Sequence, residues 1–132
     1  MGTWSAEPFG NDTAADWAYE LEDHVDWGIV SAALHVVADS DPSRLDADDA
    51  TVAVAAAEVV ARGLGRVKTP AFSEHVEAYI ARAPRPTVEL VALAHRAVAI
   101  ATSEAGELAE LWEGDADWLS ENERLRAALT TG

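Results

Sequence analysis

One carboxylate lies in the most apolar stretch of the chain and is the first candidate for chemistry. Glu58 stands in the run AAAEVVA, and Arg62 follows four residues later, which is the spacing of neighbours on one helical face. A buried carboxylate is unfavourable unless it is paired. The favoured interpretation places Glu58 and Arg62 on a wet helix edge together with Thr51. A buried structural ion pair and a buried catalytic acid remain open as alternatives.

The four histidines lack the spacing of a metal site. His24 follows Glu20 by four residues, so the two can share one helix face, but two ligands do not make a site and no HExxH pattern occurs. His35 falls on the polar edge of its helix, His75 begins a polar helix, and His95 stands among apolar neighbours. The sequence therefore predicts no metal ion and no cofactor.

Nucleophilic catalysis also has no signature in this chain. There is no cysteine and no GxSxG motif. The stretch GLGRVKTP resembles a phosphate-binding loop only superficially, because it follows a predicted helix rather than a strand and lacks the GK[ST] ending. These gaps favour a non-catalytic protein, and enzymatic activity is kept as an alternative.

The opening stretch MGTWSAEPFGNDTAADW carries aromatic rings where no helical or strand period exists. Exposed rings gain nothing in water, so we expect an ordered arm over residues 1–12 whose Trp4 and Phe9 fill a gap between helices. The residues PFGND are typical of turns. Asn11 or Asp12 is therefore expected to help hold the start of the first helix.

The functional alternative is that this arm lines a groove in which polar side chains face a ligand. The candidate ligand-binding residues are Trp4, Phe9, Asn11, Asp12, Asp16 and Glu58. His95 joins this set if the protein is an enzyme. Such a site requires that these side chains converge on one pocket, because groups that act together must reach one substrate.

The same opening residues carry a resemblance to a known family. The pattern is Met-Gly-x-Trp, then a Pro-Phe pair, then Asn-Asp, then Ala-x-Asp before the first helix, and here it is formed by Met1, Gly2, Trp4, Pro8, Phe9, Asn11, Asp12, Ala14, Ala15 and Asp16. Glu58 within AAAEVVA and the stretch ELAELW ending at Trp112 are similar as well. On these residues the chain resembles the bacterial domain of unknown function family 4259 over most of its length. The resemblance implies a shared architecture and no established activity.

The chain is strongly acidic, since nine basic and 24 acidic residues give a formal net charge of −15 over 132 residues. Residues 1–60 and 103–132 are acidic, whereas residues 61–102 are mildly basic. This balance argues against binding to duplex nucleic acid or to anionic membranes, both of which need a basic face. The oppositely charged segments are expected to face one another in the fold. A local anion site is the alternative, formed by Arg62, Arg66, Lys68, Arg82 and Arg85.

Helical signals dominate, and they predict an all-α, single-domain bundle of about six or seven helices over residues 1–132. The helices are expected at about 13–24, 25–38, 47–63, 73–82, 88–102 and 116–129, with a further short turn or two before Gly114. Small alanine and valine side chains place the helix at 47–63 in the centre of the bundle, with Asp46 as its cap.

Three details of these helices are specific enough to test. Thr13 is predicted to cap the first helix, with Asp16 in the position of a capping box. The second helix has only a narrow polar edge and is predicted to be mostly buried; this edge consists of Gly28, Ser31, His35 and Asp39. In the last helix Trp118, Leu119, Leu125 and Leu129 are expected to point inward.

Three functions follow from these features. We expect first a non-catalytic, acidic binding or protein-interaction module that acts on a protein partner or on itself. One alternative is a small-ligand-binding protein or enzyme with a carboxylate-containing pocket near the arm, and another is an immunity-type protein that neutralises a basic partner. No stretch reaches the ~20 apolar residues of a membrane span, the start lacks the basic leader of a secretory signal, and cysteine is absent. We therefore expect a cytoplasmic bacterial protein.

Overall fold

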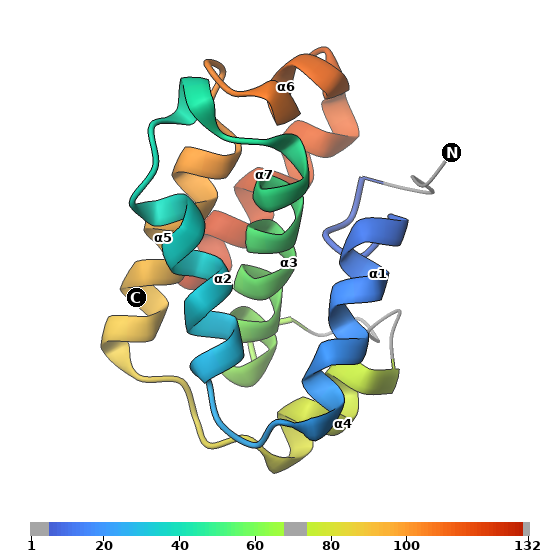
Figure 1. Ribbon diagram of the computed structural model, residues 1–132, viewed down its shortest axis with the longest axis vertical. Coiled ribbons are helices and arrows are strands. Elements are labelled where there is room, and N and C mark those ends of the chain that lie inside the picture. Colours follow the sequence, from blue (N-terminus) through green and yellow to red (C-terminus); the bar gives the residue numbers. More distant parts are fainter. Residues whose placement is uncertain (1–5, 68–73, 131–132) are drawn as a thin grey trace.

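The computed structural model describes residues 6–67 and 74–130, and these residues form an all-α bundle as predicted. The helices in this part of the chain are α1 (Asp12–Tyr19), α2 (Gly28–Ala38), α3 (Ala47–Gly63), α4 (Glu74–Arg82), α5 (Val88–Ala101), α6 (Glu107–Trp112) and α7 (Ala116–Leu129). Short 3₁₀ turns lie at Glu20–Asp23 and Pro42–Arg44. Figure 1 shows α1 on one side of α3 and the pair α2 and α5 on the other. Trp4 and Lys68, which the sequence analysis named, lie outside the described residues.

Helix α3 is the centre of the bundle, as its composition predicts. It contacts each of the other α-helices, and its side chains from Ala53 to Ala61 are all buried. Small alanine side chains let neighbouring helices approach closely. The Asp46 carboxylate accepts a hydrogen bond from the Asp48 backbone N–H at 2.8 Å, so the predicted cap is confirmed.

The end of α3 is set by Gly65, whose φ of 76° lies in the left-handed region that favours glycine. The Gly65 N–H donates to the Arg62 carbonyl and the Arg66 N–H donates to the Ala61 carbonyl, which is the Schellman pattern of hydrogen bonds. This turn aims the Arg66 side chain at the end of α7. There its Nη1 donates to the carbonyl oxygens of Ala128 at 3.0 Å and Thr130 at 2.8 Å.

The start of α1 differs from the predicted cap. Asn11 is the capping residue, and its Oδ1 accepts a hydrogen bond from the Ala14 N–H at 2.8 Å. The prediction of Thr13 as the cap is therefore wrong, whereas the expected role of Asn11 at the helix start is confirmed. Asn11 holds this place because its backbone is extended, at φ −152° and ψ 160°, as a capping residue requires.

The prediction that α2 is mostly buried is wrong. Only Val30, Leu34 and Val37 of this helix are buried, while Val36 is 51% exposed. Because α2 contacts α3 and α5 on one side, its opposite side faces solvent. Val25, which was expected within the second helix, precedes it and is exposed as well.

A similar correction applies to α7. Trp118, Leu125 and Leu129 are buried as predicted, but Leu119 is 51% exposed. The inward face instead includes Asn122, which is 6% exposed. The last helix thus turns a polar side chain inward and an apolar one outward.

The described end of the arm belongs to the core. Phe9 is 4% exposed and lies in the same buried cluster as the side chains of α3. Its ring therefore occupies the kind of place that the sequence predicted for it.

Candidate functional site

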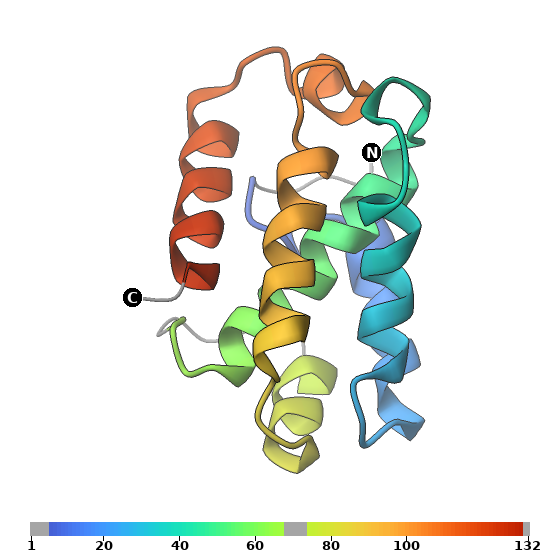
Figure 2. The same cartoon turned by 90° about the vertical axis from the view of Figure 1, so that its left-hand side faces the viewer.

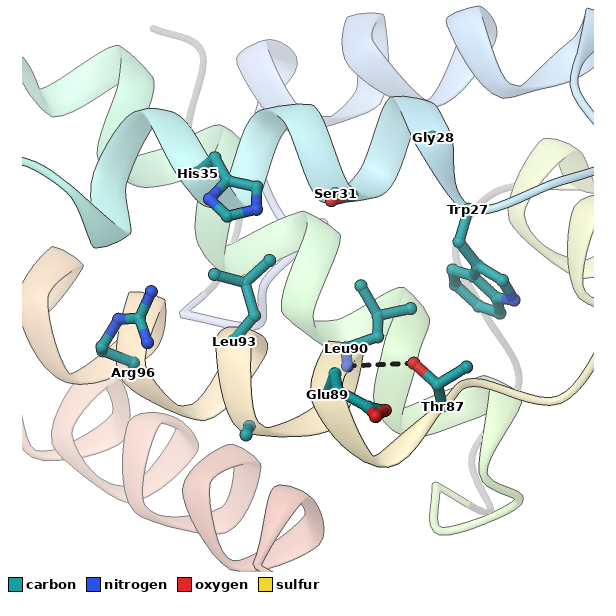
Figure 3. A pocket seen from close by; sticks show the side chains of 10 residues that line it. Trp27, Gly28, Ser31, His35, Thr87, Glu89, Leu90, Leu93 and Arg96 are labelled. Atoms are coloured by element: carbon teal, nitrogen blue, oxygen red, sulfur yellow. Dashed lines mark hydrogen bonds between the residues drawn. The ribbon is translucent and has the colours of Figure 1, made fainter.

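Helices α2 and α5 run side by side and leave a groove between them. Figure 2 shows both helices on the face turned to the viewer. The groove has a volume of about 580 Å³, and its lining residues are Trp27, Gly28, Ser31, His35, Thr87, Glu89, Leu90, Ala92, Leu93 and Arg96. Leu90 and Leu93 are buried and form its floor, while polar side chains stand at its rim (Figure 3).

One end of the groove is built by Trp27, whose indole is held from several directions. Its Nε1 donates to the Pro84 carbonyl at 2.7 Å, and its ring meets the Tyr79 ring edge-on with centroids 5.3 Å apart. A Cβ atom on Gly63 would lie only 2.9 Å from the Trp27 ring, so the glycine makes room for the indole. The ring is therefore ordered before any partner arrives.

The start of α5 closes the same end. Thr87 caps the helix, and its Oγ1 accepts a hydrogen bond from the Leu90 N–H at 3.1 Å (Figure 3). Threonine is one of the residue types that are preferred at this position. Because the cap fixes the first turn of α5, the exposed side chains that follow it have defined directions.

The opposite end of the groove is charged. His35 Nδ1 lies 3.4 Å from Asp39 Oδ2, and Arg96 Nη2 lies 4.0 Å from Asp39 Oδ1. All three side chains are largely exposed, so these contacts stabilise the fold little. They leave the imidazole and the guanidinium accessible at the rim.

The face that carries the groove is the least charged part of a very acidic molecule. The exposed residues of α2 are Gly28, Ala32, His35 and Val36, and those of α5 are Val88, Glu89, Ala92, Arg96 and Ala99. These nine positions hold one acid and one base, and the exposed acids Asp26 and Asp39 flank α2 at its two ends. Many exposed acids lie on other helices, among them Asp12, Asp16, Glu20, Glu22, Asp23, Asp48, Asp49, Glu107, Glu110, Glu113, Asp115, Asp117 and Glu123.

Glu58 is away from this groove and is buried, with 2% of its surface exposed. Its Oε2 accepts from Arg62 Nε at 2.9 Å, and its Oε1 accepts from Arg124 Nη2 at 3.1 Å. The wet-edge interpretation is therefore wrong, because the carboxylate is enclosed between two guanidinium groups. The sequence found the first partner by its spacing and missed the second, which comes from α7.

Arg124 itself is held by a second carboxylate. Its Nη2 donates to Glu121 Oε1 at 3.0 Å. Burial would lower the pKa of Arg124, but the hydrogen bond with Glu121 and the negative charge of Glu58 outweigh it and raise the pKa above its ordinary value. Glu58, Arg62, Arg124 and Glu121 thus form a connected ion network that joins α3 to α7.

The predicted ligand residues at the arm do not all meet. Asn11 lines a second cleft of about 400 Å³ together with Thr13, Ala47, Asp48, Thr51, Leu108, Leu111 and Trp112. Phe9 is buried in the core, and Glu58 is engaged in the ion network. Asp12 and Asp16 are exposed on α1 and are not among the residues that line either cleft described here.

Most arginines of the basic middle segment contact other parts of the same chain. Arg62 binds Glu58, Arg66 binds the carbonyl groups at the end of α7, and Arg82 donates to the carbonyl groups of Leu21, Glu22 and His24. These carbonyls end a helical turn, where positive charge is favourable. The arrangement favours the structural interpretation of the uneven charge over a shared anion site.

The sequence pattern predicted the residues that form one wall of the groove, but not the groove itself. The predicted polar edge of the second helix contains Gly28, Ser31 and His35, and these three line the groove. The opposite wall was missed, although Glu89, Ala92 and Arg96 stand at helical spacing in the sequence. The groove could be predicted only if the packing of α2 beside α5 were known, and no pattern within one helix shows this.

The described residues form neither a metal site nor a membrane span. Over residues 6–67 and 74–130, no three side chains of the metal-binding types come together. Within the same ranges, every helix is too short or too polar to cross a membrane.

The fold and the groove define a class of protein, namely a small all-α bundle with one nearly uncharged face. A family model described as a domain of unknown function (DUF4259) matches residues 2–123, and the chain belongs to this family. Neither the curated proteins nor the solved structures contain a match to the chain. Since the family description names no activity, the function has to be argued from the site.

Proposed function

We propose that this protein is a non-catalytic protein-interaction module whose docking surface is the groove between α2 and α5. One observation carries the proposal, which is that the exposed side of these two helices holds one acid and one base on a chain with a net charge of −15. Removing charged groups from water is unfavourable, so interfaces exclude charge from their centres. Few charged groups on this face would have to leave water when a partner docks, so it is suited to form an interface.

The shape and the chemistry of the groove support the same function. Apolar surface that leaves water on docking contributes about 25 cal/mol per Å². The exposed apolar side chains beside the groove are Ala32 and Val36 on α2 and Val88, Ala92 and Ala99 on α5, above a floor of Leu90 and Leu93. Trp27 is the kind of fixed aromatic anchor that dominates many interfaces, and its ordering cost is met in the free protein. The charged groups near Arg96 lie at one end of the groove, so they can fix the orientation in which a partner docks.

The test is site-specific photo-crosslinking in cells of the native host. A benzoylphenylalanine residue replaces Ala92 in the groove, and a matched variant carries it at Ala127, which is equally an exposed alanine on a helix but lies on α7. We expect a discrete protein adduct from position 92 and none from position 127. An absence of adducts at both positions, or equal adducts at both, would contradict the proposal.

A second candidate function is binding of a small ligand in the cleft beside the arm. The observation that favours it is that Asn11, a residue named from the sequence, lines this cleft with the carboxylate of Asp48. The test is a thermal-shift screen of metabolites on the protein and on Thr51→Trp, which fills the cleft. A ligand of this site raises the melting temperature of the original protein only. A set of ligands that act equally on both proteins would count against it.

The proposed module acts in the cytoplasm and on protein rather than on nucleic acid. The absence of cysteine and the excess of acidic residues support these two points. A fluorescent fusion and a binding assay with duplex DNA at low salt test them directly. Membrane-associated fluorescence or salt-sensitive DNA binding would overturn them.

A further inference from the structure

We propose that the groove is occupied by a second copy of this chain, which docks with its α5 antiparallel to α5 of the first. The proposal rests on the proposed function, because it names the partner of the same surface. The two-fold axis passes near Ala92, midway between Glu89 and Arg96. Each copy then supplies one acid and one base to the contact.

The pattern of exposed side chains on α5 is the first argument. Glu89 and Arg96 are seven residues apart, so they lie on the same helical face and about 10 Å apart along its axis. Within residues 6–67 and 74–130, Glu89 forms no ion pair, and the ion pair of Arg96 is the one with Asp39, at 4.0 Å. Both charges are therefore accessible to a partner.

Two-fold symmetry makes the charges on α5 of the two copies complementary. A two-fold axis perpendicular to α5 reverses the direction of the second helix, which brings Glu89 of one copy opposite Arg96 of the partner subunit. The reciprocal pair forms at the same time, because a two-fold interface uses the same patch on both copies. The exposed apolar residues of α5 flank these pairs, and they are Val88, Ala92 and Ala99. A side chain as small as that of Ala92 lets two helices approach to about 8–10 Å.

The total charge selects a second copy over a basic partner. Two chains that each carry −15 repel one another, so a contact between them needs a face with few acids. The exposed residues of α2 and α5 hold one acid and one base, and Asp39 at the end of α2 adds one acid beside Arg96. A basic partner would be attracted instead to the acidic residues of α1 and α6, which lie on other helices. The Glu89 and Arg96 pairs add register and direction to the apolar contact rather than most of its affinity.

The experiment uses charge reversal and sedimentation velocity over a range of protein concentrations. We expect the original chain to dimerise, and E89R and R96E each to weaken the dimer about tenfold or more, because each places like charges opposite one another. The double variant E89R/R96E restores the dimer, since the exchanged charges again alternate. An equimolar mixture of the two single variants also dimerises, because one variant then carries two bases and the other two acids at the contact.

The matched controls are Glu123→Arg and Arg126→Glu, which reverse exposed charges on α7 and leave dimerisation unchanged. Circular dichroism checks that every variant is folded. A monomer at all concentrations overturns the proposal, and so does a dimer that the single reversals leave intact. Failure of both the double variant and the mixture to restore the dimer overturns the antiparallel geometry. If the chain is monomeric and the crosslink from position 92 captures a different protein, the further inference fails while the proposed function stands.

Discussion

Glu58 illustrates how a single residue can look catalytic in the sequence and be structural in the fold. Its two oxygens are each occupied by a guanidinium nitrogen, at 2.9 Å from Arg62 and 3.1 Å from Arg124. Because both oxygens of this buried carboxylate bind guanidinium groups of the same chain, its charge is already neutralised within the fold. Among the described residues no buried side-chain nitrogen or oxygen lacks a hydrogen-bond partner, so the network satisfies its own groups.

Removal of the Glu58 charge is expected to destabilise the protein. Glu58→Gln leaves Arg62 and Arg124 without their shared counter-ion, and we expect the free energy of unfolding to fall by about 2–4 kcal/mol. The loss is held below that of a fully buried pair because the Arg124 side chain is 38% exposed and can be rehydrated. Urea denaturation measures it. Glu121→Gln is the control and costs less than about 1 kcal/mol; an equal loss in both variants would show that the centre of the network is elsewhere.

Tyr79 gives a prediction about pH. Its side chain is fully buried and its hydroxyl donates to the Asp26 carbonyl. Burial, and then the negative charge of Asp26, raise the pKa of Tyr79 from 10.0 to about 12, against the opposing effect of Arg82. The neutral phenol therefore stabilises the fold below pH 10, and this contribution is lost as the pH rises from 10 towards about 12.

The measurement is an ultraviolet titration of the two tyrosines. We expect one phenol to ionise near pH 12 in the folded protein and this step to be absent from Tyr79→Phe. Circular dichroism along the titration reports whether the protein is still folded. A titration in which Tyr79→Phe loses a step at pH 10 instead would contradict the assigned environment.

At the scale of helices, the approach of Trp27 to Gly63 positions the groove. The indole spans from the start of α2 to the end of α3, where a Cβ atom would meet it at 2.9 Å and Pro86 at 3.0 Å. Neither ring can move aside easily, because the indole is hydrogen-bonded to Pro84 and a proline ring is rigid. The glycine thus matters for space and not for an unusual backbone angle.

Gly63→Ala is therefore expected to destabilise the bundle even though alanine favours helices. Overpacking costs about 1–3 kcal/mol, which exceeds the gain of up to about 1 kcal/mol in helix propensity. Thermal unfolding of Gly63→Ala, Trp27→Leu and the double variant measures the coupling. The double variant should recover most of the loss caused by Gly63→Ala. Additive effects would show that the two residues do not compete for the same space.

For the whole molecule, the dominant property is the unbalanced charge. Exposed acids are concentrated on α1, at the start of α3, and on α6 with the start of α7. Three arginines of the middle segment bind a carboxylate or backbone carbonyl groups of the same chain. Repulsion between exposed charges is screened by salt, whereas the buried pairs of Glu58 are screened much less. Self-repulsion of this kind destabilises a compact chain.

Added salt is therefore expected to stabilise the fold. Raising sodium chloride from about 0.01 M to about 0.15 M shortens the screening length from about 30 Å to about 8 Å. We expect the melting temperature to rise by at least about 3 °C, which corresponds to roughly 1 kcal/mol for a chain of this size. Differential scanning calorimetry at one low protein concentration measures the change. A melting temperature that falls with salt would mean that attractive surface pairs outweigh the repulsion.

Local patterns were sufficient to predict most of the helices and the cap of α3. Asp46 caps this helix as expected because capping depends on residues within three positions of each other. The central place of α3 was readable from its small side chains. The sequence also determined the net charge and its uneven distribution along the chain, since neither depends on the fold.

Contacts between distant residues were decided by the tertiary structure alone. Glu58 and Arg124 are 66 positions apart, and only the packing of α7 on α3 brings them together. Leu119 and most of α2 were expected to be buried because of their apolar side chains. Leu119, and Val36 on α2, instead lie on the side of the helix that no neighbour covers. The groove likewise exists because α2 and α5 lie side by side, and helical periodicity within one segment carries no information about which segments become neighbours.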